Sequence, residues 1–175
     1  MNKKIVLIGY MGSGKTSIGQ ALANIFKIPF IDLDNEIVKV EKKSIDKIFI
    51  ENGELYFRKI EYKCLKNILK SSVLSIISLG GGTPCYFDTI EMLNENDKID
   101  TIFLRTSINN LTERLFKQIN HRPKIKHLNS KKVLNEFIGK HLFERNQFYN
   151  KSKLVITTDN KSISEIADEI KFKLT

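Results

Sequence analysis

Residues 9–16 read GYMGSGKT and match the pattern G-x-x-x-x-G-K-[ST] without a mismatch. An apolar, β-branched run at 5–8 comes before this stretch, and apolar residues at helical spacing follow it. Glycines let the backbone turn tightly enough for successive N–H groups to converge on one anion, and the start of a helix adds partial positive charge. The strand, the loop and the helix together predict a cradle for the phosphates of a nucleotide.

Two side chains at the end of this stretch have predicted roles. We expect the Lys15 ammonium to reach the β- and γ-phosphates and the Thr16 hydroxyl to hold Mg²⁺. The alternative is a glycine-rich turn that merely starts a helix. The strand before the pattern and the helix after it argue against this alternative, because a chance match rarely has both.

Two carboxylates follow in the next predicted strand, residues 30–34. The period-two alternation of a strand places Asp32 and Asp34 on the same side of its C-terminal end. In an open parallel sheet the ligand crevice lies outside that end of the strands, so the pair suits a Mg²⁺ site and a hydroxyl acceptor. The alternative is that one carboxylate caps the next helix, expected to begin near Glu36, and for Asp34 this is a serious rival.

Only five of the 29 basic residues are arginine, and the other 24 are lysine. Because Lys cannot replace the planar fork of Arg, each arginine is informative. Arg58 stands three residues before Glu61 on a predicted helix, and from these residues alone an ordinary surface pair is favoured. Three consecutive glycines at 80–82 follow a predicted strand, and they fit a close approach of ligand to backbone or a flexible turn equally well.

Composition and length describe a globular protein of 175 residues, expected to be one domain over 1–175. No apolar run approaches the roughly 20 residues of a membrane span, and the chain leads directly into the strand of the nucleotide loop, so a cytoplasmic protein is expected. The net charge of +9 fits nucleic acid, anionic small substrates or a lysine-rich surface. The lysines are scattered along helical segments, which favours a solvated surface.

The order of predicted elements alternates strand and helix, with strands at 5–8, 30–34, 73–79, 101–104 and 154–157. This alternation predicts an α/β fold with a parallel sheet and helices on both faces. Residues 120–132 are polar and basic and contain a proline, so a loop is expected there. A loop of this length in a compact domain is usually functional, a lid for example, and the alternative is a disordered surface loop.

Six motifs in this order resemble those of the shikimate kinase family, small P-loop kinases related to nucleoside monophosphate kinases. The motifs are GxMGSGKTSIG at 9–19, DxD at 32–34, NGExxFRxxE at 52–61, SLGGG at 78–82, RP at 122–123 and ERNxxY at 144–149. The resemblance spans essentially the whole chain. It implies a three-layer P-loop kinase fold with strand order 2-3-1-4-5, a lid at about 119–132 and a substrate-binding helical region at about 33–61.

The resemblance also implies a reaction, the transfer of the γ-phosphoryl group of ATP to the 3-hydroxyl of shikimate, a step of aromatic amino-acid biosynthesis. Thr16 would ligate Mg²⁺ and Asp32 would support it through water, while Lys15 would hold the phosphates. Arg122, on the lid, would contact the nucleotide and screen the charge of the transferring phosphoryl group. The backbone amides implied to hold the phosphates are those of Gly12, Ser13, Gly14, Lys15, Thr16 and Ser17.

Shikimate itself would be bound by Asp34, Arg58, Gly80, Gly81, Gly82 and Arg145. Asp34 would hydrogen-bond the attacking hydroxyl and is the candidate base. Arg58 and Arg145 would grip the substrate carboxylate, which suits a bidentate fork. The glycine turn would bring backbone donors to the ring hydroxyls, with Gly81 first among them.

Departures from the family pattern are few. Gln147 stands where a proline is usual, Lys124-Ile125 where leucines are usual, and 151–153 where Ala-Asp is common; the first two bear on the geometry around Arg145 and on lid packing. Rival functions are another small-molecule kinase such as a gluconate kinase, a GTP-dependent switch protein, and a nucleic-acid-binding ATPase. We expect a monomer that binds neither nucleic acid nor a membrane.

Overall fold

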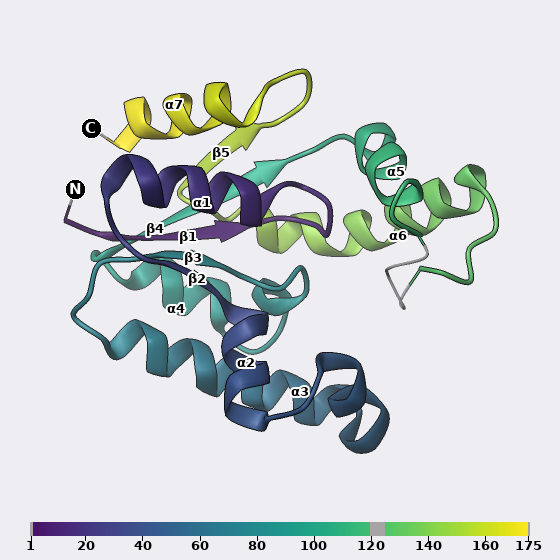
Figure 1. Ribbon diagram of the computed structural model, residues 1–175, viewed down its shortest axis with the longest axis horizontal. Helices are drawn as coiled ribbons and strands as arrows, with labels where there is room; N and C mark the ends of the chain where they lie inside the picture. The colour runs from purple at the N-terminus through teal and green to yellow at the C-terminus, as the bar shows by residue number, and fades with distance from the viewer. Residues whose placement is uncertain (1, 120–124, 175) are drawn as a thin grey trace.

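The computed structural model describes residues 2–119 and 125–174, and it contains a five-stranded parallel sheet in the order β2-β3-β1-β4-β5 (Figure 1). This order and the parallel pairing confirm the expected fold. The carboxyl ends of all five strands therefore lie at one edge of the sheet, where a ligand crevice is expected. The strands are β1 (Lys4–Ile8), β2 (Phe30–Asp32), β3 (Ile76–Ser78), β4 (Ile99–Arg105) and β5 (Leu154–Thr157).

Helices cover both faces of the sheet, which gives three layers (Figure 1). Alternation along β1 sends Ile5 and Leu7 into the hydrophobic cluster beneath α1 and α7, and Val6 and Ile8 into the larger cluster on the opposite face. The helices are α1 (Lys15–Phe26), α2 (Leu33–Glu41), α3 (Ile45–Lys70), α4 (Thr89–Glu95), α5 (Ile108–Phe116), α6 (Lys131–Tyr149) and α7 (Ile163–Leu174), with a 3₁₀ turn at Thr83–Cys85.

Several element boundaries differ from those expected. Strand β2 ends at Asp32, because the Asp32 carboxylate accepts hydrogen bonds from the backbone N–H groups of Asp34 (3.1 Å) and Asn35 (3.4 Å) and so caps α2. The capping residue is thus Asp32 and not Asp34. Strand β3 begins at Ile76, where pairing with β1 and β2 begins, and not at 73.

Helix α3 changes direction at Gly53, whose φ of 79° and ψ of 173° are not helical. The sequence predicts two helices separated at 52–53, and the structure confirms a break there. The first of them begins after Ser44, whose hydroxyl accepts a hydrogen bond from the Lys47 amide at 3.3 Å. Helix α2 and the first half of α3 make up the region at 33–61.

The segment expected to form the lid is described only in part. Arg122 and its neighbours at 120–124 lie outside the described residues. Ile125 is fully buried and Leu128 nearly so, and both pack into the larger hydrophobic cluster before α6 begins at Lys131. Among the helices described, none is long and apolar enough to span a membrane.

Candidate active site

The loop between β1 and α1 has the backbone geometry of an anion cradle. Gly12 and Gly14 have φ values of 81° and 95°, a region that side chains rarely adopt, and Gly14 is the N-cap of α1. The first hydrogen bond within α1 runs from Ile18 N to Gly14 O at 2.9 Å, so the helix itself does not use the N–H groups of its first turn. The Ser13 hydroxyl is buried and has no hydrogen-bond partner among the described residues. These features fit the phosphates of a nucleotide.

Lys15 lies folded back along this loop. Its side chain is nearly buried, and its ammonium donates to the carbonyls of Gly9 at 2.8 Å and Tyr10 at 3.0 Å. The ammonium thus contacts two backbone carbonyls beside the helix N-terminus. A phosphate is a stronger acceptor for an ammonium than a carbonyl is. The phosphate of a ligand can therefore replace the two carbonyls as the acceptor of the Lys15 ammonium.

A cavity of about 540 Å³ opens over the loop. It is lined by the whole stretch from Met11 to Ile18 and by both predicted carboxylates, Asp32 and Asp34. The two carboxylates thus line one cavity as expected, but Asp34 stands in the first turn of α2 and not on the strand where the sequence placed it. Among the described residues, no group of three or more His, Cys, Asp or Glu side chains could hold a metal by itself. Thr16 and Asp32 fit a Mg²⁺ ion whose remaining ligands are phosphates and water.

The same cavity contains side chains that the sequence analysis missed. Arg114 of α5 lines it and donates from Nη1 to the Gly12 carbonyl at 3.2 Å, and Gln118 and Lys161 also lie on its wall. Arg114 belongs to none of the six motifs. The only feature of Arg114 that stands out in the sequence is that the chain has few arginines, and this does not indicate where Arg114 lies in the fold.

A second cavity, of about 720 Å³, adjoins the first. The two share Met11, Asp34 and Gly81, so Asp34 lies where they meet. Arg58 of α3 and Arg145 of α6 both line the second cavity, as the sequence predicts. Gln147, in place of the usual proline, lies within α6, which continues past Arg145 to Tyr149, and its side-chain Nε2 donates to the Glu144 carbonyl at 3.0 Å.

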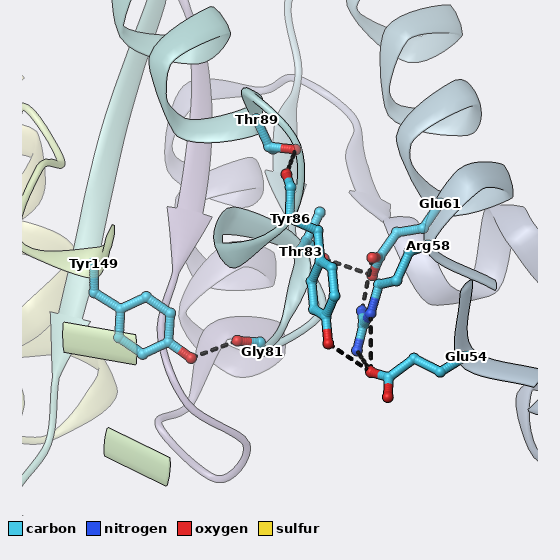
Figure 2. Close-up of polar contacts among 8 residues, drawn as sticks. All are labelled: Glu54, Arg58, Glu61, Gly81, Thr83, Tyr86, Thr89 and Tyr149. Atoms are coloured by element: carbon cyan, nitrogen blue, oxygen red, sulfur yellow. Dashed lines mark hydrogen bonds and ion pairs between the residues drawn. The ribbon is translucent and has the colours of Figure 1, made fainter. Parts of the chain in front are cut away.

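Arg58 lies at the centre of a polar network (Figure 2). Its Nη1 donates to Glu61 at 2.7 Å, and its Nε and Nη2 donate to one oxygen of Glu54 at 3.3 and 3.2 Å. That oxygen also accepts from the Tyr86 hydroxyl at 2.8 Å, and Glu61 accepts from Thr83 at 2.6 Å. The pair with Glu61 therefore exists, but both side chains are buried, so the favoured interpretation as a surface pair was wrong.

Burial alone would lower the pKa of Arg58, but the charges of Glu61 and Glu54 outweigh it and the pKa lies above its usual value. The guanidinium also lies over the ring of Tyr86, at 4.4 Å from its centroid. A buried cation held from several sides is preorganised to receive a further anion in the cavity.

The turn at 80–82 is packed and not flexible. A Cβ built on Gly82 would lie 2.6 Å from Arg58 Nη2, and one on Gly80 would lie 2.9 Å from Glu61 Oε1. The Gly81 carbonyl accepts a hydrogen bond from the Tyr149 hydroxyl (Figure 2). The glycines thus allow the buried ion pair to lie directly against the backbone.

We expect Gly82→Ala to lower the free energy of unfolding by about 1–3 kcal/mol, because the new methyl group must displace a guanidinium held by two carboxylates. Gly81→Ala is the matched control. Its Cβ would come no closer than 3.5 Å to any neighbour, so a change within about 0.5 kcal/mol is expected. Urea unfolding of both variants measures the difference, and equal stabilities would show that Arg58 moves aside at no cost.

Comparisons with known proteins point to one family. The family model described as shikimate kinase matches residues 11–175. The shikimate kinase of Flavobacterium johnsoniae is 44% identical over 168 residues, covering 96% of each chain. The crystal structure of shikimate kinase from Bacteroides thetaiotaomicron has a TM-score of 0.89 at 32% identity and covers 98% of both chains.

Two further structures distinguish similarity to the family from similarity of fold. Shikimate kinase from Acinetobacter baumannii, solved in complex with shikimate, has a TM-score of 0.85 at 26% identity, covering 98% of this chain and 92% of that one. A gluconokinase from Sinorhizobium meliloti reaches a TM-score of 0.59 at 18% identity, covering 99% of this chain and 98% of that one, a likeness that shows a common fold and nothing further. From its sequence, its fold and its site, this chain belongs to the shikimate kinase family.

Proposed function

We propose that the protein transfers the γ-phosphoryl group of ATP to the 3-hydroxyl of shikimate, giving shikimate 3-phosphate and ADP. The observation that carries this proposal is the meeting of two cavities at Asp34 and Gly81, one over the phosphate loop and one lined by two arginines. A donor phosphate and an acceptor hydroxyl bound in these cavities would approach each other at Asp34. The matches to shikimate kinases over nearly the whole chain support the same reaction.

The residues of the first cavity bind and orient the donor. The loop from Gly12 to Ser17 and the Lys15 ammonium hold the phosphates, and Thr16 and Asp32 would hold Mg²⁺. When bound, the metal ion neutralises charge that develops on the phosphate oxygens. Lys15 exchanges its two backbone carbonyls for phosphate oxygens.

The residues of the second cavity orient the acceptor. Arg58 and Arg145 hold the carboxylate of shikimate from opposite elements, α3 and α6. Asp34, in the first turn of α2, accepts the hydrogen bond of the attacking hydroxyl and takes its proton. The Gly81 backbone, held by Tyr149, lies between the two cavities and contacts the ring hydroxyls.

A substrate panel assayed for ADP release tests this function. ATP with shikimate should release ADP well above the rate with ATP alone, and gluconate or a nucleic acid should add nothing. GTP with shikimate should be a poorer donor than ATP. Equal release with gluconate and shikimate would instead favour a broader sugar-acid kinase.

Arg122 is proposed to close over the transferring phosphoryl group. Arg122→Ala should lower kcat by more than it raises the KM for shikimate, because its contact forms only in the closed, reacting state. Lys126→Ala, which removes an exposed cation from the same segment, is the control. Unchanged kinetics for both substrates in Arg122→Ala would remove this residue from the mechanism.

We further infer that residues 1–175 act as one domain and as a monomer in the cytoplasm, where ATP is available, with no nucleic-acid or membrane partner. In support, the phosphate loop, Asp34 and both carboxylate-binding arginines come from the same chain. Size-exclusion chromatography with light scattering measures the oligomeric state.

A further inference from the structure

Tyr10 is the second residue of the phosphate loop, and its side chain extends from the loop to helix α6. Its side chain is only 1% exposed, and its hydroxyl lies 2.9 Å from Nδ1 of His141. His141 stands one helical turn before Arg145, so the two side chains lie on the same face of α6. The contact therefore joins the loop that binds phosphate to the helix that carries a substrate arginine.

The Tyr10 ring also contacts Arg145 itself. The Arg145 guanidinium lies 5.5 Å from the centroid of this ring, within the range of a cation–π contact. His141 also contacts Phe137, with 4.2 Å between the ring centroids and an angle of 53° between the ring planes. Phe137, His141 and Arg145 are consecutive turns of α6 and all line the second cavity.

The chemistry of the pair is that of a fixed donor and an acceptor. Burial raises the pKa of Tyr10 to about 12, against the opposing effect of the Arg145 charge, so the phenol keeps its proton at neutral pH. A protonated phenol can donate to His141 Nδ1 when the imidazole is the neutral tautomer with its proton on Nε2. This bond holds the hydroxyl end of the Tyr10 side chain against α6, and the Arg145 guanidinium lies over the same ring.

We propose that Tyr10 and His141 form a positioning pair that orients Arg145 toward the carboxylate of the substrate. Neither residue belongs to the groups assigned above to the phosphates, the metal or shikimate. The pair acts through Arg145 and is held from the nucleotide side, since the Tyr10 carbonyl accepts a hydrogen bond from Lys15. The inference rests on the proposed function, because it assumes that Arg145 binds the shikimate carboxylate.

Tyr10→Phe tests the pair with the least disturbance, because it keeps the ring under Arg145 and removes only the hydroxyl. The Kd for shikimate, measured by calorimetry, should rise about 2- to 13-fold, which corresponds to the net value of one hydrogen bond. The Kd for ADP should stay unchanged. His141→Ala should weaken shikimate binding similarly, and Tyr10→Phe combined with His141→Ala should be no worse than either alone.

His141→Asn is the conservative variant, since its side-chain oxygen can take the place of Nδ1 as acceptor, and it should restore most of the affinity that His141→Ala loses. Tyr62→Phe is the matched control. It removes the hydroxyl that donates to Asp88 at 2.6 Å, and because neither residue lines the two cavities, it should leave the shikimate Kd unchanged. Urea unfolding of each variant shows that the protein measured is folded.

The outcomes separate this inference from the proposed function. Normal shikimate binding by both Tyr10→Phe and His141→Ala would overturn the pair while leaving the proposed function intact. An equal loss of ADP and shikimate affinity would also overturn it, because the pair would then support the whole loop and not Arg145. Failure of the wild-type protein to bind shikimate or to release ADP with it would overturn the proposed function itself.

Discussion

Replacing Lys15 with alanine should leave a folded protein whose rate of phosphoryl transfer is at least roughly 100-fold lower, as is typical when an electrostatic contact to the reacting group is lost. The position of Lys15 in the structure explains the expected loss. Its ammonium is already inside the loop, 2.8 Å from the Gly9 carbonyl, and needs only to exchange acceptors when phosphate arrives. Coupled detection of ADP at saturating ATP and shikimate measures the loss.

Lys39→Ala is the control for this experiment. Lys39 forms an exposed pair with Glu36 on α2, so its removal lowers the net charge equally but touches neither cavity. Wild-type turnover is expected for the control. If Lys15→Ala kept more than about a tenth of wild-type turnover, the phosphate loop would not work as proposed.

Removing either carboxylate-binding arginine should weaken shikimate binding while sparing ATP. A charge-assisted hydrogen bond is worth about 1.5–3 kcal/mol, so Arg58→Ala and Arg145→Ala should each raise the shikimate Kd roughly 10- to 150-fold. Lysine at either position should restore only part of the loss, because it keeps the charge without the planar fork. The double variant should be less than additive, since both arginines bind one group. Calorimetric titration with shikimate and with ADP measures these changes.

Arg58→Ala should also lower the stability of the protein, an effect that Arg145→Ala does not test. Glu61 is 2% exposed and pairs with Arg58 at 2.7 Å, so Arg58→Ala leaves a buried carboxylate without its cation. Breaking a buried pair in this way costs about 3–5 kcal/mol of stability. Arg58→Ala combined with Glu61→Gln removes the orphaned charge and should recover stability without recovering shikimate affinity.

Arg105→Ala is the control for both arginine variants. Arg105 bonds the exposed Asn150 side chain at 2.9 Å and lines neither cavity, so shikimate binding should be unaffected. If folded Arg58→Ala or its combination with Glu61→Gln bound shikimate normally, Arg58 would serve only the ion pair. The carboxylate site would then have to lie elsewhere.

The sequence determined those features that depend on neighbours along the chain. The phosphate loop, the alternation of strands and helices, and the break at Gly53 all follow from patterns of a few residues, and the structure confirms each. The resemblance of the six motifs and their order to those of the family predicted two further features. These are the strand order and the binding of one substrate by Arg58 and Arg145. The structure bears out the order and brings the two arginines to one cavity.

Only the tertiary structure decided features that depend on which surfaces meet. The residues favoured a surface pair for Arg58, but packing of α3 against the turn at 80–82 buries it, and no helical spacing reports burial from a distant loop. Asp32 and Asp34 were both possible caps of α2. Asp32 is the cap because the pairing of β2 with β3 ends at this residue and α2 begins directly after it. Contacts of Arg114 with Gly12, and of Tyr10 with His141, join segments more than a hundred residues apart. Such contacts arise from the packing of helices around the sheet edge, because side chains far apart in sequence meet only once the layers are assembled.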